Sequence, residues 1–137
     1  MKWIWSFIIS LTLTLPVLAQ AQQRGEQIES VKIAFISRKL DLTTDEAQRF
    51  WPLYNNYQKE IGDILKQKKQ TKLSNATDPD AQLDGELDFE ERILDIRKKY
   101  SREFTKVIPS QKVLLLYQAE REFRQQLIKQ LKDRRKY

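Results

Sequence analysis

The chain has 137 residues, with 25 basic and 19 acidic side chains, a net charge of +6, and neither cysteine nor histidine. Without cysteine it has no disulfide, thiolate nucleophile or cysteine-based zinc site, and without histidine it lacks the commonest general base and metal ligand. Three glycines and four prolines disfavour phosphate-binding glycine loops and turn-rich β architectures, and the length fits one domain.

Residues 1–21 form an apolar segment that carries one positive charge near its start. An apolar run follows Lys2 up to Leu18, and the small residues Ala19 and Ala21 come next. This pattern is typical of a secretory signal peptide, so we predict export with cleavage after Ala21. The alternative is an uncleaved membrane anchor, for which the run is short, because a spanning helix needs about 20 apolar residues. Export also excludes nucleic acid as the partner of the basic charge.

The remaining 22–137 segment is predicted to be one all-α domain. Apolar residues recur there at intervals of three and four, which is typical of helices with one buried face. The segment from Leu73 to Gly85 has little periodicity and is rich in turn-forming residues, so we expect a loop there. The spacing predicts four helices, at residues 26–39, 44–72, 86–107 and 109–134.

Local signals mark how the second and fourth helices begin. Thr43 and Glu46 have the spacing of a capping box, in which each side chain bonds to the backbone amide of the other residue. Pro52 lies inside the second helix and lacks an amide hydrogen, so we expect a kink or a short break near Trp51. Pro109 suits the first position of the last helix.

These lengths predict the fold class, an all-α, elongated four-helix hairpin or bundle with long kinked helices. A thin bundle buries little surface per residue and leaves apolar stripes partly uncovered. We therefore expect the protein to form a homodimer.

No arrangement of residues points to catalysis or to a bound cofactor. No serine has a histidine base, and the pair Glu86 and Glu90 fits a solvated helix face better than a glycosidase site, since no cleft residues accompany it. Acidic residues between 78 and 90 lack the spacing of an EF-hand calcium loop. Zinc, copper and nickel sites need His, Cys or Met, none of which follows residue 21. We predict no enzyme, no cofactor and no soft or borderline metal.

Two groups of side chains are candidates for binding other proteins. Aromatic residues near Pro52 would ordinarily fill the core, but exposed at a kink they would form a binding surface. The lysines near the end of the second helix would ordinarily be a solvated face, but they can also attract acidic partners. The candidate residues are Phe50, Trp51 and Tyr54 for apolar contact, and Lys66, Lys68, Lys69 and Lys72 for attraction.

The starts of the second and fourth helices resemble a known motif. Leu42-Thr43-Thr44-Asp45-Glu46 resembles the LTxxQ motif of the Spy/CpxP family of periplasmic proteins, and Val107-Ile108-Pro109-Ser110-Gln111 resembles its second copy. Residues 40–61 and 117–131 are also similar to the Bacteroidetes-type branch that is often labelled "sensor of ECF-type sigma factor".

Both copies depart from the family pattern. In the first, Glu46 replaces Gln, which preserves the capping-box geometry. In the second, Val107 and Ile108 replace Leu and Thr, which keeps Pro109 and Gln111 but loses a capping hydroxyl that is typically worth about 1 kcal/mol. We therefore expect the motif residues to start helices and not to bind a ligand.

The resemblance implies a function. Spy-like members are cradle-shaped, antiparallel, all-α dimers that hold unfolded proteins without ATP, whereas CpxP-like members restrain a membrane stress sensor. Related members bind zinc or other metals, for which this chain lacks the ligands. Our leading hypothesis is an exported holdase that, as the resemblance implies, acts in the periplasm on unfolded or partly folded envelope proteins. The alternatives are a regulator that binds the periplasmic part of a sensor kinase or anti-sigma factor, and a structural coiled coil, against which the irregular apolar spacing argues.

Overall fold

The computed structural model describes the backbone of residues 17–74 and 77–135, and the side chains from residue 23 onwards. Within these ranges the chain forms four helices and no strand, so the predicted all-α four-helix class is confirmed. The helices are α1 (Val17–Leu40), α2 (Thr44–Ser74), α3 (Pro79–Phe104) and α4 (Ser110–Arg134).

The predicted signal segment lies largely outside the described residues. Only its last residues, from Val17, are described, as the first turn of α1. The first helix therefore begins well before residue 26, where the apolar spacing placed its start. None of the helices in the described ranges is both long and apolar enough to cross a membrane. Cleavage after Ala21 stays a prediction.

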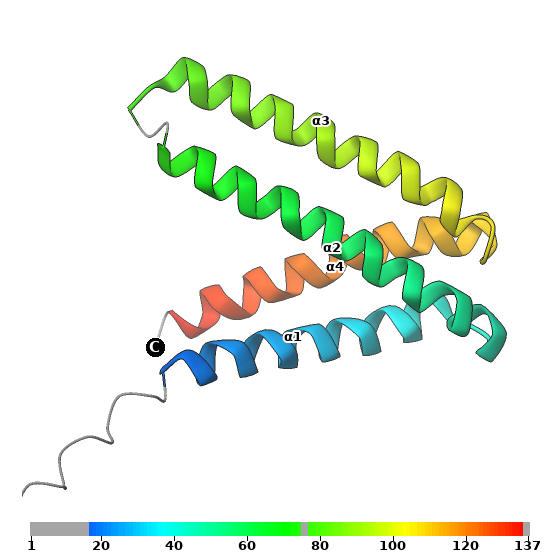
Figure 1. Cartoon of the computed structure of the whole chain (residues 1–137). Helices are drawn as coiled ribbons and strands as arrows, with labels where there is room; N and C mark the ends of the chain where they lie inside the picture. Colours follow the sequence, from blue (N-terminus) through cyan, green and yellow to red (C-terminus); the bar gives the residue numbers. More distant parts are fainter. Residues whose placement is uncertain (1–16, 75–76, 136–137) are drawn as a thin grey trace, which may run out of the picture.

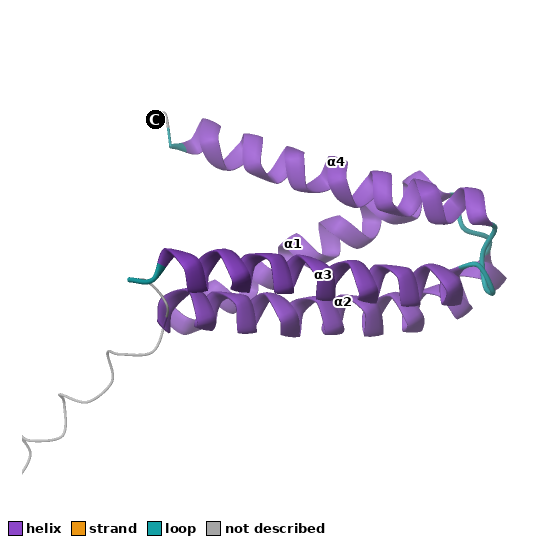
Figure 2. Ribbon diagram, turned by 90° about the horizontal axis from the view of Figure 1, so that it is seen from above, coloured by secondary structure: helices purple, strands orange, loops and turns teal. Residues whose placement is uncertain are grey.

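The four helices form two antiparallel pairs that meet at one end. Helix α1 packs along α4 and α2 packs along α3, while α3 and α4 touch over a short stretch. The turns at 41–43 and 105–109 lie at the same end of the molecule, and from there the pairs diverge (Figures 1 and 2). We call these pairs the α1/α4 arm and the α2/α3 arm, and the end where they meet the junction.

The predicted loop at 73–85 is too long, because α3 begins at Pro79. The Asp78 carboxylate accepts hydrogen bonds at 3.1 Å from the amides of Asp80 and Ala81, and Pro79 occupies the first helical position. The Asp-Pro pair that predicted a loop is thus a helix start, since an N-cap and a turn favour the same residue types.

Two further boundaries differ from the prediction. Helix α3 ends at Phe104, and residues up to Ile108 form turns. Pro109 has an extended ψ of 145° and caps α4 from outside without a side-chain hydrogen bond, so Ser110 and not Pro109 is the first helical residue. Helix α2 runs continuously through Pro52, so the predicted break is absent, and the kink stays a prediction.

The main core lies at the junction and takes residues from all four helices. Phe104 sits at its centre, with ring centroids 5.4 Å from Phe50 and 5.7 Å from Tyr57. Each arm beyond the junction is only two helices thick, and ring contacts such as Phe35 with Phe123 (5.8 Å) hold it together. The core residues are Ile36, Leu40, Phe50, Tyr54, Tyr57, Tyr100, Phe104, Ile108, Val113, Leu116 and Ala119.

Candidate functional site

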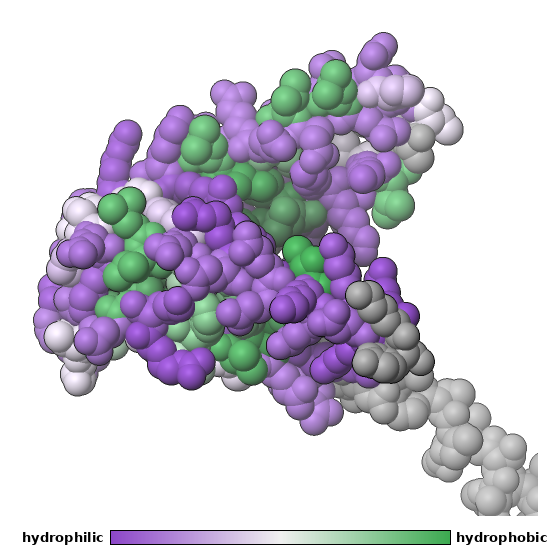
Figure 3. Space-filling view, turned by 180° about the vertical axis from the view of Figure 1, so that it is seen from behind, coloured by the Kyte–Doolittle hydropathy of each residue, from purple (hydrophilic) through white to green (hydrophobic). Residues whose placement is uncertain are grey.

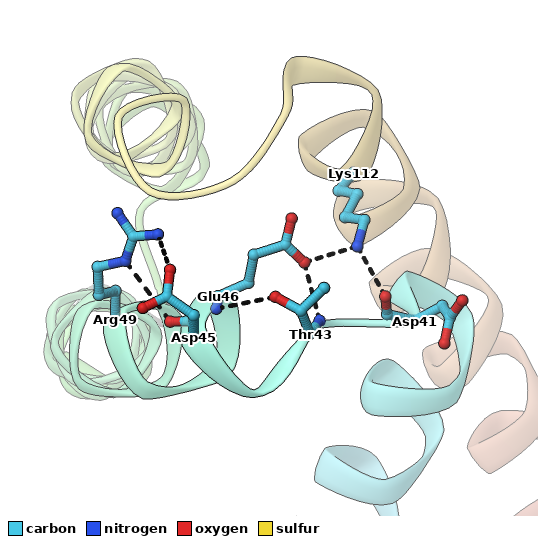
Figure 4. A network of polar contacts seen from close by, with 6 residues as sticks. All are labelled: Asp41, Thr43, Asp45, Glu46, Arg49 and Lys112. Carbon is cyan, nitrogen blue, oxygen red and sulfur yellow. Dashed lines mark hydrogen bonds and ion pairs between the residues drawn. The ribbon is translucent and has the colours of Figure 1, made fainter.

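The predicted capping box is present and is bonded to the start of α4 (Figure 4). The amide of Thr43 donates to Glu46 Oε2 at 2.9 Å, and the amide of Glu46 donates to Thr43 Oγ1 at 3.2 Å. Lys112 Nζ also donates to Glu46 Oε2, at 2.6 Å, and to the Asp41 carbonyl at 2.7 Å. The hydrogen bond from Lys112 is the largest cause of the lowered pKa of Glu46.

The other motif residues lie at the core or at the start of a helix. Leu42 packs against the core, and Pro109 caps α4, while Gln111 is exposed. The contact between the two motif copies comes from Lys112, one residue beyond the second copy. The motif residues thus start helices and tie the junction together.

Two of the three predicted apolar contact residues have no accessible surface. Phe50 and Tyr54 are each 0% exposed, so the prediction that they contact a bound protein is wrong for this fold. Trp51 is half-buried, with its ring centroid 4.9 Å from that of Phe50 and 5.6 Å from that of Tyr54. The reason is that the α2 stripe carrying Phe50 and Tyr54 faces the junction, so these residues fill the core.

The four predicted lysines do not form one patch. Lys66, Lys69 and Lys72 are exposed, whereas Lys68 is half-buried and forms an ion pair with Glu86 of α3. Lys68 and Lys72 line a pocket of about 250 Å³ near the far end of the α2/α3 arm, and the other two lysines do not. Three of the lysines therefore remain available for attraction of acidic partners.

A buried carboxylate that the sequence analysis missed connects the two arms. Glu120 of α4 is only 8% exposed. Its Oε1 accepts hydrogen bonds from the Tyr54 hydroxyl at 3.2 Å and from Gln58 Nε2 at 2.9 Å, and its Oε2 accepts one from the Tyr57 hydroxyl at 3.4 Å. Burial raises the pKa of Glu120. The signal was its position in the apolar stripe, four residues after Leu116.

A pocket of about 270 Å³ lies beside Glu120, in the angle between α3 and α4. Arg97 is the only α3 residue that lines this pocket. The Nε of Arg97 is buried without a hydrogen-bond partner among the described residues. We call this cavity the arginine pocket. Its lining residues are Arg97, Leu114, Tyr117, Glu120, Arg121 and Arg124. No spacing within one helix could have predicted it, because it needs the approach of α3 to α4.

The exposed face of α4 continues from this pocket towards the end of the helix. Residues 114, 121, 124 and 128 are separated by seven, three and four positions, which places them on one face. Leu114 is 72% exposed and Ile128 is 52% exposed. We call this face the α4 surface. It consists of Leu114, Arg121, Arg124, Ile128, Leu131 and Lys132, all exposed.

The molecular surface is hollowed between the two arms, as Figure 3 shows from behind, with hydrophobic residues scattered among hydrophilic ones on both arms. Helix α3 adds exposed Leu83, Leu87 and Leu94, which share one face by their spacing. No group of three acidic side chains in the described ranges is arranged to hold a metal ion.

The arrangement offers exposed apolar and cationic side chains on the same helix, which suits contact with another polypeptide. Comparisons of the chain with protein-family models, with curated proteins and with solved structures find no match.

Proposed function

We propose that this protein is an exported, ATP-independent holdase-type chaperone of the Spy/CpxP family, which binds unfolded or partly folded proteins in the periplasm and catalyses no reaction. The observation that carries the proposal is the α4 surface, where apolar and cationic side chains share one exposed helix face. Unfolded chains present apolar and acidic groups in no fixed order, so a surface that offers both kinds of contact can hold many of them.

The two-arm shape supports the proposal. The surface is hollowed between the diverging arms (Figure 3), so a bound chain can lie between them without displacing the core. The exposed lysines near the end of the α2/α3 arm add long-range attraction, which is screened beyond about 8 Å at physiological salt. Such attraction speeds encounter more than it strengthens binding.

The resemblance to Spy/CpxP proteins supports the same function. The first motif copy forms the capping box expected of it, and the second lies at the start of α4. We further propose a homodimer, since the α3 leucines Leu83, Leu87 and Leu94 leave an apolar face exposed in the single chain.

An aggregation assay tests the proposed function. Residues 22–137, the product of the proposed processing, are mixed without ATP with two unrelated, chemically unfolded proteins, and light scattering is followed during dilution. Suppression of both aggregation reactions at near-stoichiometric amounts is the expected result. A folded sample that suppresses neither reaction contradicts the holdase proposal and favours a regulator with one dedicated partner, such as the periplasmic part of a sensor kinase or anti-sigma factor.

A further inference from the structure

We infer that the arginine pocket binds the carboxylate of an acidic residue in a polypeptide held on the α4 surface. This inference rests on the proposed function, and it names the chemical class of segment that the protein prefers. The pocket brings three guanidinium groups, from Arg97, Arg121 and Arg124, to one cavity of about 270 Å³. None of the three forms an ion pair with a carboxylate in the part of the chain that the structure describes.

Arg97 is only partly satisfied within the chain: a side-chain hydrogen bond joins it to Tyr57, but one of its nitrogens has no partner in the described ranges. Its Nε is the one buried side-chain nitrogen or oxygen without a hydrogen-bond partner among the described residues. Its backbone carbonyl is engaged, since it accepts hydrogen bonds from Ser101 Oγ at 2.7 Å and from the Tyr117 hydroxyl at 3.2 Å. A buried donor without an acceptor is destabilising, and a negative charge placed in the pocket offsets part of this cost, although the buried Nε itself is closed to solvent.

Glu120 is the one carboxylate that lines the pocket, and it does not accept a hydrogen bond from Arg97 Nε. Both oxygens of Glu120 already accept hydrogen bonds, from Tyr54, Tyr57 and Gln58. Three guanidinium groups facing one carboxylate leave the pocket with excess positive charge. Guanidinium groups recognise carboxylates through paired N–H donors, which favours an acidic ligand over a neutral one.

The size and surroundings of the pocket favour a side chain over a free small molecule. Small-molecule sites usually enclose roughly 300–1,000 Å³ and bury most of their ligand, and this cavity lies just below that range and opens beside exposed Leu114. Along α4, Arg124 and Ile128 are about 6 Å apart, since each helical residue rises 1.5 Å. Two residues of an extended peptide span about 6.6 Å. A segment of the form Glu-x-Leu can therefore place its carboxylate in the pocket and its leucine on Ile128.

Peptide binding to residues 22–137, the same protein as in the aggregation assay, tests the inference. Two fluorescent eight-residue peptides differ only in Glu-x-Leu against Gln-x-Leu, and fluorescence anisotropy measures their affinities. We expect the Glu peptide to bind about tenfold more tightly, as a charge-assisted hydrogen bond provides. The expected effect of Arg97→Gln is loss of this preference with the affinity for the Gln peptide unchanged.

Two further variants control for unfolding and for a general effect of removing one positive charge. Arg124→Gln alters an exposed residue, so we expect the fold to be retained and the preference to be reduced. Lys66→Gln makes the same charge change at an exposed residue of the other arm, and it should retain the full preference. Equal affinities of the wild type for both peptides, or an equal loss of preference in Lys66→Gln, would overturn the inference.

The outcome also separates this inference from the proposed function. A Glu preference that depends on Arg97, in a protein that suppresses no aggregation, keeps the pocket assignment and removes the holdase proposal. Suppression of aggregation without any Glu preference keeps the holdase proposal and removes the pocket assignment.

Discussion

Lys112 Nζ lies 2.6 Å from Glu46 Oε2, and this ion pair joins the first turn of α4 to the capping box that starts α2. Both side chains are less than a quarter exposed, and Lys112 also donates to the backbone carbonyl of Asp41. The pair therefore connects three segments at the junction: the end of α1, the start of α2 and the start of α4 (Figure 4).

Replacing Lys112 tests the role of this connection. We expect Lys112→Met to lower the melting temperature at neutral pH, because Glu46 loses the partner that lowers its pKa most. A carboxylate with a lowered pKa stabilises the fold above its ordinary pKa and loses this effect as the pH falls through the lowered value. The difference in melting temperature should therefore shrink at acid pH. Lys106→Met, which removes an exposed pair with Glu103, is the control and should change little.

The capping hydroxyl of Thr43 is the target of a second prediction. Thr43→Ala removes the acceptor for the Glu46 amide and should lower the free energy of unfolding by about 1 kcal/mol. Thr44→Ala is the matched control one position later, where no capping bond is made, and it should have a much smaller effect. Chemical denaturation measures both changes, and equal effects of the two substitutions would contradict the capping role.

The buried Glu120 predicts an unusual pH dependence. Burial raises its pKa, although Arg124, Lys32 and Arg97 act in the opposite direction, so the folded state binds a proton more readily than the unfolded chain does. Its contribution to stability is therefore greatest at low pH and falls as the pH rises through the raised value. Glu120→Gln keeps an acceptor for Tyr54 and Gln58 and avoids the buried charge. We expect this variant to melt at a higher temperature than the wild type at pH 7.5.

A pH series provides the control for this prediction. The advantage of Glu120→Gln should disappear at acid pH, where the wild-type carboxyl is protonated and equally neutral. Differential scanning calorimetry from pH 4 to pH 8 measures both proteins. If Glu120→Gln melts at a lower temperature than the wild type at every pH, the cationic neighbours stabilise the charged carboxylate. The prediction that the variant is more stable at pH 7.5 is then wrong.

The exposed lysines of α2 predict salt-dependent capture. Replacing Lys66, Lys69 and Lys72 by serine should slow the association of an unfolded acidic protein at low salt, by up to about tenfold, and have little effect at high salt. Lys68→Ser should slow it less, because the charge of Lys68 is already paired with Glu86. Stopped-flow fluorescence measures the rates. Unchanged capture at low salt by the triple variant would rule out a role for these charges.

Local signals along the chain were sufficient to predict much of the fold. The capping box was predictable because its two hydrogen bonds join residues only three positions apart. The stripe that carries Phe50 and Tyr54 indicated which face of α2 is buried, although the same aromatic residues were also assigned to binding. The start of α3 was misplaced because Asp78 and Pro79 favour a loop as well as a helix N-terminus.

The sequence by itself determined the helical class, the start of α2 and, to within one residue, the start of α4, since these depend on periodicity and on contacts within one turn. Only the tertiary structure decided that Glu120 is buried against Tyr54 and Tyr57, and that Lys112 reaches Glu46. Only it brought Arg97 of α3 beside Arg121 and Arg124 of α4. Such groups meet because two helix pairs cross at the junction, and the angle of that crossing is set by the packing of side chains far apart in the chain.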